Sequence, residues 1–278
     1  MAGRISNSFA LVKASARVLQ LDKELMVFPL MSGIATLLVI ASFITPIFLV
    51  GPEVFDSENP SYLAYVLGFL FYLVQYTVIF FFNAALVGAA LIRLDGGDPT
   101  VSDGLAIASR RMGSIIGYAA IAATVGMILR AISERSGLVG KIVAGLMGMA
   151  WTLTTYLTVP ILVTKDIGPI DAVKESAKIF KRTWGEQVIG NFGMGAAVML
   201  IGLAWTAVSV ALIVAMASLG MGLSILAAVG IMVLGYVVLA LWASALNGIY
   251  TAALYRYAMT GETGVFDAQI MGNAFRPK

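Results

Sequence analysis

The sequence contains neither cysteine nor histidine among its 278 residues. Without cysteine, the chain has no disulfides, no iron–sulfur clusters and no thiolate zinc sites. Without histidine, it lacks the commonest general base and the commonest metal ligand of proteins. We therefore expect no enzymatic activity, no cofactor and no bound metal ion.

Charged residues are scarce too, at 12% of the chain against about 25% in soluble domains. Hydrophobic residues make up 60%, and most of them lie in six long segments that are uncharged apart from Arg256 at the end of the last. The six segments are 25–50, 62–92, 112–129, 142–163, 188–219 and 223–257. Because about 20 apolar residues cross a bilayer core as a helix, we predict an all-α polytopic membrane protein with six transmembrane helices in one domain, 1–278.

A basic amphipathic pattern recurs three times, each time just before a pair of these segments. In the stretch 170–184, IDAVKESAKIFKRTW, four apolar residues recur at helical spacing and the cations lie mostly elsewhere on the circumference. The three apolar stripes are Val173, Ala177, Phe180 and Trp184; Ile5, Phe9, Val12 and Ala16; and Val101, Leu105, Ala108 and Met112. We therefore expect each helix to lie on the membrane surface.

The same pattern predicts three repeats of an amphipathic helix followed by a transmembrane hairpin. The units cover approximately residues 4–95, 98–166 and 168–260, and a polar C-terminal tail, 261–278, follows them. The end of each hairpin carries a basic residue, namely Arg93, Lys165 and Arg256.

Basic residues of the amphipathic helices are expected to face anionic lipid headgroups, where each contributes about 1 kcal/mol. They are Lys13, Arg17, Arg110, Arg111, Lys174, Lys178, Lys181 and Arg182. Nucleic-acid binding is not expected, because the positive charge is divided among separate helices beside the membrane.

Lysine and arginine are distributed unequally between the two ends of the spans: 15 lie on one side and only Arg130, Arg135 and Lys141 on the other. The positive-inside rule then predicts a multi-pass plasma-membrane protein with both termini and all three amphipathic helices in the cytoplasm.

Several polar side chains interrupt the apolar segments. They are Gln75, Asn83, Thr152, Thr155, Asn191 and Asn247. We expect the amides to form interhelical hydrogen bonds and the threonines to bond to their own backbone; contact with a substrate or a pore is the alternative. All 15 acidic residues lie outside the segments, which disfavours coupled ion transport.

The acidic stretch DGGDPTVSDG is similar in part to the aspartate-rich motif of membrane phosphatidyltransferases. Pro99 stands where that motif needs glycine, and no second aspartate pair follows. We therefore interpret Asp95, Asp98 and Asp103 as loop residues and helix caps, with Asp98 or Thr100 as the N-cap of the next helix.

The stretch SFALVKASARVLQLDKELMVFPLMSG, residues 8–33, resembles the N-terminal signature of an uncharacterised family of prokaryotic six-helix membrane proteins. More distantly, the three-unit pattern resembles the membrane domain attached to some bacterial glycerophosphodiester phosphodiesterases. These resemblances imply six helices in a plasma membrane, and they carry over no catalytic residue.

Two functional classes stay open. We favour a non-enzymatic membrane module that binds lipids or a partner, either another membrane protein or a second copy of itself. The alternative is an uncoupled transporter or channel for small or lipid-like substrates, since a facilitator needs no ionisable group within the membrane.

Overall fold

The computed structural model describes residues 2–50, 61–135, 137–184, 193–219 and 222–262. Over these ranges the chain is helical with no strand, and it has six helical segments long and apolar enough to cross a membrane, as expected. The elements are α1 (Ala2–Leu21), the 3-10 helix η1 (Lys23–Met26), α2 (Val27–Val50), α3 (Tyr62–Leu94), α4 (Val101–Arg110), α5 (Met112–Arg135), α6 (Gly137–Thr154), α7 (Thr158–Thr164), α8 (Pro169–Trp184), α9 (Gly193–Ser218) and α10 (Gly222–Thr260).

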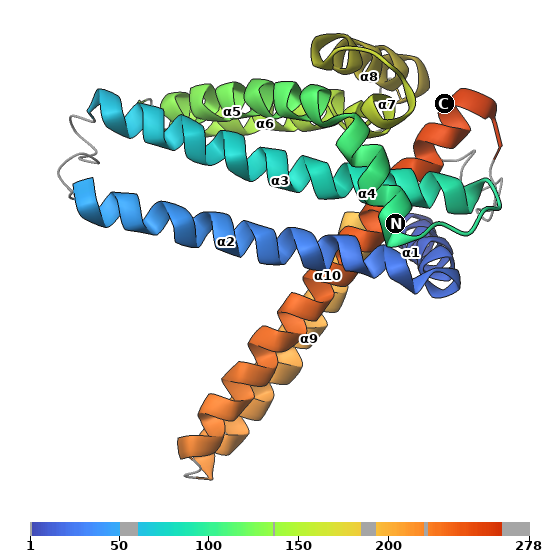
Figure 1. The fold of residues 1–278 in the computed structure, drawn as a ribbon. Coiled ribbons are helices and arrows are strands. Elements are labelled where there is room, and N and C mark those ends of the chain that lie inside the picture. Colours follow the sequence, from blue (N-terminus) through green and yellow to red (C-terminus); the bar gives the residue numbers. More distant parts are fainter. Residues whose placement is uncertain (1, 51–60, 136, 185–192, 220–221, 263–278) are drawn as a thin grey trace.

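Four of the spans, α2, α3, α5 and α6, run side by side and form a block (Figure 1). Helix α3 is central, since it contacts α2, α4, α5, α7 and α10. Its second half is an unbroken run of buried small and aliphatic residues, from Ala84 to Ala90. Small side chains let neighbouring backbones approach closely, which is how helices associate where both the lipid and the protein are apolar.

The α9–α10 hairpin leaves this block at a steep angle and touches it near one end only (Figure 1). The buried residues of α10 that pack against the block lie in its C-terminal half, among them Leu246, Ile249 and Leu254, whereas Leu226 and Leu234 are exposed. At 1.5 Å per residue, the 39 residues of α10 extend about 58 Å, far more than the about 30 Å of a bilayer core. This length suits a helix that crosses the bilayer with a strong tilt.

Helices α1, α4 and α8 gather at the end of the block where the α9–α10 hairpin is attached, which we call the basic end (Figure 1). Helix α4 crosses α3 very closely there. A Cβ atom at Gly104 would lie 2.5 Å from the ring of Phe28 and 2.7 Å from the carbonyl oxygen of Ala85. A Cβ atom at Gly88 of α3 would lie 2.9 Å from Ile107 of α4. The crossing therefore depends on two glycines.

The span boundaries differ from the sequence prediction in the second hairpin. Helix α5 continues to Arg135 and α6 begins at Gly137, so Arg130 and Lys141, which were expected to bound a turn, lie within helices. Gly137 makes the reversal possible with φ of +55°.

The expected fourth span is broken. Helix α6 ends at Thr154 and α7 starts at Thr158, because Pro160 lacks an N–H group and its ring clashes with the carbonyl of Tyr156 four residues earlier in a regular helix. The start expected for the fifth span, and Asn191 with it, lie outside the described residues, as does most of the C-terminal tail.

Candidate functional site

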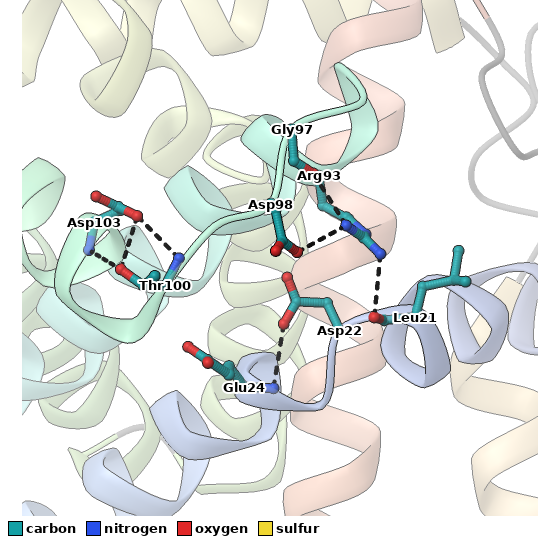
Figure 2. A network of polar contacts seen from close by, with 8 residues as sticks. All are labelled: Leu21, Asp22, Glu24, Arg93, Gly97, Asp98, Thr100 and Asp103. Carbon is teal, nitrogen blue, oxygen red and sulfur yellow. Dashed lines mark hydrogen bonds and ion pairs between the residues drawn. The ribbon is translucent and has the colours of Figure 1, made fainter.

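Three polar features meet at the basic end. They are a junction of charged side chains, the exposed cations of α1, α4 and α8, which we call the surface helices, and the break in the fourth span. In the junction, Arg93 at the end of α3 donates through Nη1 to the carbonyl of Gly97 and to Asp98, each at 3.1 Å (Figure 2). Its Nη2 donates to the carbonyl of Leu21, also at 3.1 Å. Arg93 therefore ties the end of α1 to the α3–α4 connection.

The acidic residues of this connection serve as caps and ion-pair partners, as expected. Thr100 and Asp103 form a capping box at the start of α4, so Thr100 and not Asp98 is the N-cap (Figure 2). Hydrogen bonds from the Thr100 backbone and side chain lower the pKa of Asp103. Glu24 of η1 adds a further cap by accepting from the N–H of Val101 at 2.8 Å. These bonds fix α4 to the start of the first span.

Asp22 is the one buried carboxylate among the residues that the structure describes, with 6% of its surface exposed. It lies between Glu24 and Arg93 (Figure 2). One oxygen accepts from the N–H of Glu24 at 3.2 Å, and the other is buried without a hydrogen-bond partner. Burial raises the pKa of Asp22, and the Glu24 N–H and Arg93 oppose this shift. Asp22 was not predicted, because it stands at an ordinary boundary between a polar helix and an apolar run.

Two further basic residues near the membrane boundary are already paired. Arg256 at the end of α10 binds Asp95 at 2.8 Å and Glu262 at 2.7 Å. Lys165, just after α7, binds Glu175 of α8 at 2.7 Å. This pair raises the pKa of Lys165 and lowers that of Glu175.

Most of the predicted headgroup-facing cations are exposed, and one is engaged within the protein. The exposed residues are Lys13, Arg17, Arg110, Lys174, Lys178, Lys181 and Arg182. Arg111 is half-buried and forms an ion pair with Asp166. Lys174 is also 3.4 Å from Asp171 on its own helix. The seven exposed cations are placed so that they can reach a charged ligand, whereas Arg111 ties the start of α5 to the connection before α8.

The stripes that face the protein coincide only in part with the apolar stripes predicted from the sequence. On α8, Ala172, Ser176 and Ile179 are buried, while Val173 and Phe180 of the predicted stripe are only half-buried. On α1, Val12 of the predicted stripe is buried and Phe9 is 43% exposed, and Leu11, Ser15 and Val18 beside the stripe are also buried. On α4, Ala108 of the predicted stripe is buried together with Gly104, whereas Met112, which begins α5, is exposed.

The offset has a physical reason. Each buried stripe contains a small residue at its centre, which allows the surface helix to approach the ends of the spans closely. The large residues Phe9 and Phe180 lie instead at the margin between the protein and its surroundings, where an apolar side chain can meet the lipid boundary. The apolar surface on each helix is therefore wider than the predicted stripe.

Ser176 of α8 fills the break in the fourth span. Its hydroxyl donates to the carbonyl of Thr154 at 2.6 Å and accepts from the N–H of Leu157 at 3.1 Å. Both backbone groups belong to the residues at which α6 ends and α7 begins. A side chain of a surface helix thus satisfies the backbone of a broken span.

On the α10 side of the same break, polar groups satisfy one another. The Tyr156 hydroxyl donates to Asn247 Oδ1 at 3.3 Å. The Thr251 hydroxyl lies 3.1 Å from the Tyr156 hydroxyl and 2.7 Å from the carbonyl oxygen of Asn247. Asn83 of α3 is adjacent, with Oδ1 3.8 Å from the position of a Cβ atom at Gly248. The structure thus brings Asn83 and Asn247 to one interface.

The other predicted polar residues in the spans have separate local roles. Gln75 of α3 donates to the Thr36 hydroxyl of α2 at 3.0 Å, which is the expected interhelical bond. Thr152 and Thr155 bond to the carbonyls of Gly148 and Trp151 in their own helix, also as expected. These residues do not converge on one site.

The GxxxG spacing at Gly113 and Gly117 does not form a two-glycine helix contact. A Cβ atom at Gly113 would have nothing within 4 Å, whereas one at Gly117 would lie 2.8 Å from Pro169 at the start of α8. Only Gly117 is therefore needed for close packing, and its neighbour is a surface helix.

No curated protein matches this sequence, and no solved structure does. The expected distant resemblance to the membrane domain of glycerophosphodiester phosphodiesterases finds no support. A family model described as a family of unknown function, DUF6159, matches residues 62–266 and so begins after the N-terminal signature at 8–33. The match covers more than half of the chain, with five of the six candidate spans and helices α4 and α8. The chain therefore belongs to the DUF6159 family, a family of unknown function.

Proposed function

We propose that this chain is a non-enzymatic integral membrane protein whose basic helices bind anionic lipid headgroups. The observation that carries the proposal is the division of the α8 surface. Ala172, Ser176 and Ile179 pack against the protein, Val173 and Phe180 lie at the margin, and the cations Lys174, Lys178, Lys181 and Arg182 are exposed. A helix with apolar residues at its margin and cations outside is suited to the headgroup layer of an anionic bilayer.

We further propose that the basic end faces the cytoplasm at the plasma membrane. The excess of lysine and arginine at this end supports that orientation. The succession of one surface helix and one hairpin, seen at α1–α3, α4–α7 and α8–α10, supports an origin from three repeats. Three such units would give the cytoplasmic face three lipid-binding helices.

A non-enzymatic role is supported by how the acidic residues near the basic end are used. Asp98, Asp103 and Glu175 are occupied in an ion pair with Arg93, a helix cap and an ion pair with Lys165. The sequence also offers no histidine or cysteine for acid–base or nucleophilic work.

One observation favours a second candidate, an uncoupled carrier or channel. Broken helices occur within the membrane where backbone groups are buried in protein or line a path for a substrate. The break before α7 has Tyr156, Asn247 and Thr251 beside it, which are neutral and polar. Such a lining would suit a small neutral hydroxylated solute.

The lipid proposal is tested by purifying the full chain in mild detergent and counting retained lipids by native mass spectrometry. A Lys174→Gln/Lys178→Gln/Lys181→Gln variant removes three exposed charges, and the corresponding triple Arg variant is the matched control because it keeps them. At about 1 kcal/mol per charge, anionic lipid should bind the Gln variant about a hundredfold more weakly. Equal retention of anionic lipid by the wild type and the Gln variant would contradict the proposal.

The carrier alternative is tested by the swelling of proteoliposomes in glycerol. Faster swelling than in protein-free vesicles, abolished by a bulky substitution such as Asn247→Phe, would favour it. An unchanged swelling rate would argue against passage of small neutral solutes.

A further inference from the structure

The side chain of Ser176 joins α8 to the backbone of the broken fourth span by two hydrogen bonds. The side chain is fully buried and bridges Thr154 and Leu157, the two residues that flank the break. The break lies inside the candidate span 137–164, and Ser176 bonds to a backbone carbonyl on one side of it and a backbone N–H on the other. Undocking of α8 would therefore leave these two backbone groups without the Ser176 hydroxyl.

Helix α8 is held in this place by two further contacts. Glu175 binds Lys165 at the end of the fourth span, at 2.7 Å. Pro169, the first residue of α8, packs on Gly117 of α5 so closely that no Cβ atom would fit between them. Exposed Lys174 and Lys178 flank the Glu175–Ser176 pair in the sequence. The cationic face and the contacts at the break therefore move together as one short helix.

The break is also joined to the root of the α9–α10 hairpin. Tyr156 is the central residue of the break, and its hydroxyl bonds to Asn247 and lies 3.1 Å from the hydroxyl of Thr251. Both partners are in the C-terminal half of α10, which packs against the block, and the rest of that helix extends away from the block (Figure 1). A small rotation at the root would be enlarged at the far end, because α10 is one continuous helix of 39 residues.

We propose that the broken fourth span couples headgroup binding by α8 to the position of the α9–α10 hairpin, with Ser176 as the positioning residue. The proposal rests on the proposed lipid binding and adds its consequence. Anionic headgroups that bind Lys174 and Lys178 set the depth of α8 in the bilayer. A change in this depth moves Ser176, which displaces its partners Thr154 and Leu157 at the break. Tyr156, between them, then shifts its hydrogen-bonded partners on α10. The coupling uses neutral hydrogen bonds, so it responds to the surface charge of the membrane only through α8.

The test measures the distance between the hairpin and the block in lipid nanodiscs. The absence of native cysteine makes a Leu38→Cys/Leu234→Cys protein specific for two spin labels, and both positions, on α2 and α10, are 65% exposed. Pulsed electron paramagnetic resonance then gives the distance distribution in nanodiscs of neutral phosphatidylcholine and in nanodiscs containing anionic phosphatidylglycerol. Lipid retention is measured on the same preparations.

With Ser176 intact, the distribution should shift between the two bilayers. Ser176→Ala should abolish the shift, and Thr152→Ala is the matched control, since it removes a hydroxyl from the same span that bonds only to its own helix. If Ser176→Ala does not fold, Tyr156→Phe tests the next contact while leaving the Ser176 bonds in place, and it should also abolish the shift.

The outcomes separate the two proposals. Retention of anionic lipid without a shift, or a shift that survives both Ser176→Ala and Tyr156→Phe, would overturn the coupling and leave the lipid-binding proposal standing. A lack of preference for anionic lipid would overturn both. A shift that Thr152→Ala also abolishes would show a general loss of rigidity and would likewise overturn the specific role of Ser176.

Discussion

Helix α4 leaves no room for a side chain at Gly104, and this position gives a sharp test of how α4 is attached to the block. In Gly104→Ala the new methyl group would meet the Phe28 ring at 2.5 Å and the Ala85 carbonyl oxygen at 2.7 Å. Phe28 is buried, and the Ala85 oxygen belongs to the backbone of the central helix, so neither can move away easily. Overpacking of this kind costs about 1–3 kcal/mol.

The net effect includes the better helix propensity of alanine, which contributes about 1 kcal/mol in the opposite direction. Taking the upper end of the packing cost, we expect Gly104→Ala to lower the free energy of unfolding by about 2 kcal/mol. Gly88→Ala should also destabilise, but by less, because the atoms that its methyl group would meet at 2.9–3.3 Å all belong to the Ile107 side chain and none to the backbone. Gly145→Ala in α6, where a Cβ atom meets nothing within 4 Å, is the control and should not destabilise.

The assay is unfolding of the purified full chain by sodium dodecyl sulfate, followed by far-ultraviolet circular dichroism. The predicted order of stability is Gly145→Ala, then Gly88→Ala, then Gly104→Ala. The reasoning would be refuted if Gly104→Ala were as stable as the wild type, or if all three variants lost the same amount of stability.

Three further predictions concern the polar residues and the orientation. Because burial raises the pKa of Asp22 above 3.8, the native state binds this proton more tightly than the unfolded chain, and the free energy of unfolding falls as the pH rises through that range. Asp22→Asn should therefore be more stable than the wild type at neutral pH, with an advantage that shrinks on acidification. An advantage independent of pH in unfolding titrations would contradict this. Gln75→Leu should change the free energy of unfolding by less than about 1 kcal/mol, because one lost interhelical bond is offset by removing a buried unpaired oxygen; a loss above 2 kcal/mol would argue against a packing role. In intact cells, an impermeant maleimide should label Leu138→Cys and not Ser109→Cys, and the reverse result would invert the proposed orientation.

The number of spans is predicted well from the sequence, since each apolar segment has at least 18 residues, whereas a buried helix of a soluble protein typically has an apolar run of about 10–14. Boundaries at the first and last hairpins are close to prediction, with α3 covering Tyr62–Leu94 and α10 covering Gly222–Thr260. The Thr100 cap was predictable too, because its spacing to Asp103 is a local signal. Features that depend only on residues within one or two turns of a helix can thus be predicted from the sequence.

Features that depend on two distant segments were not accessible. The buried face of α8 could not be read from its strongest apolar stripe, because Ser176 is polar and is buried only where a broken span offers it a donor and an acceptor. The partner that stabilises the break in the fourth span, Ser176, is on another helix. Asp22 likewise owes its burial to the packing of η1 against the end of α3.

The distribution of charge at the basic end explains why lipid is the favoured ligand. Arg93, Lys165 and Arg256, at the ends of the three hairpins, are each bound to a carboxylate of the chain itself. Their charges are therefore already paired within the protein, and a ligand would have to displace a bound carboxylate to reach them. The cations on the outer faces of α1 and α8 are exposed. An extended array of exposed positive charge distinguishes poorly between small anions, whereas a bilayer presents many headgroups at once and satisfies the array as a whole.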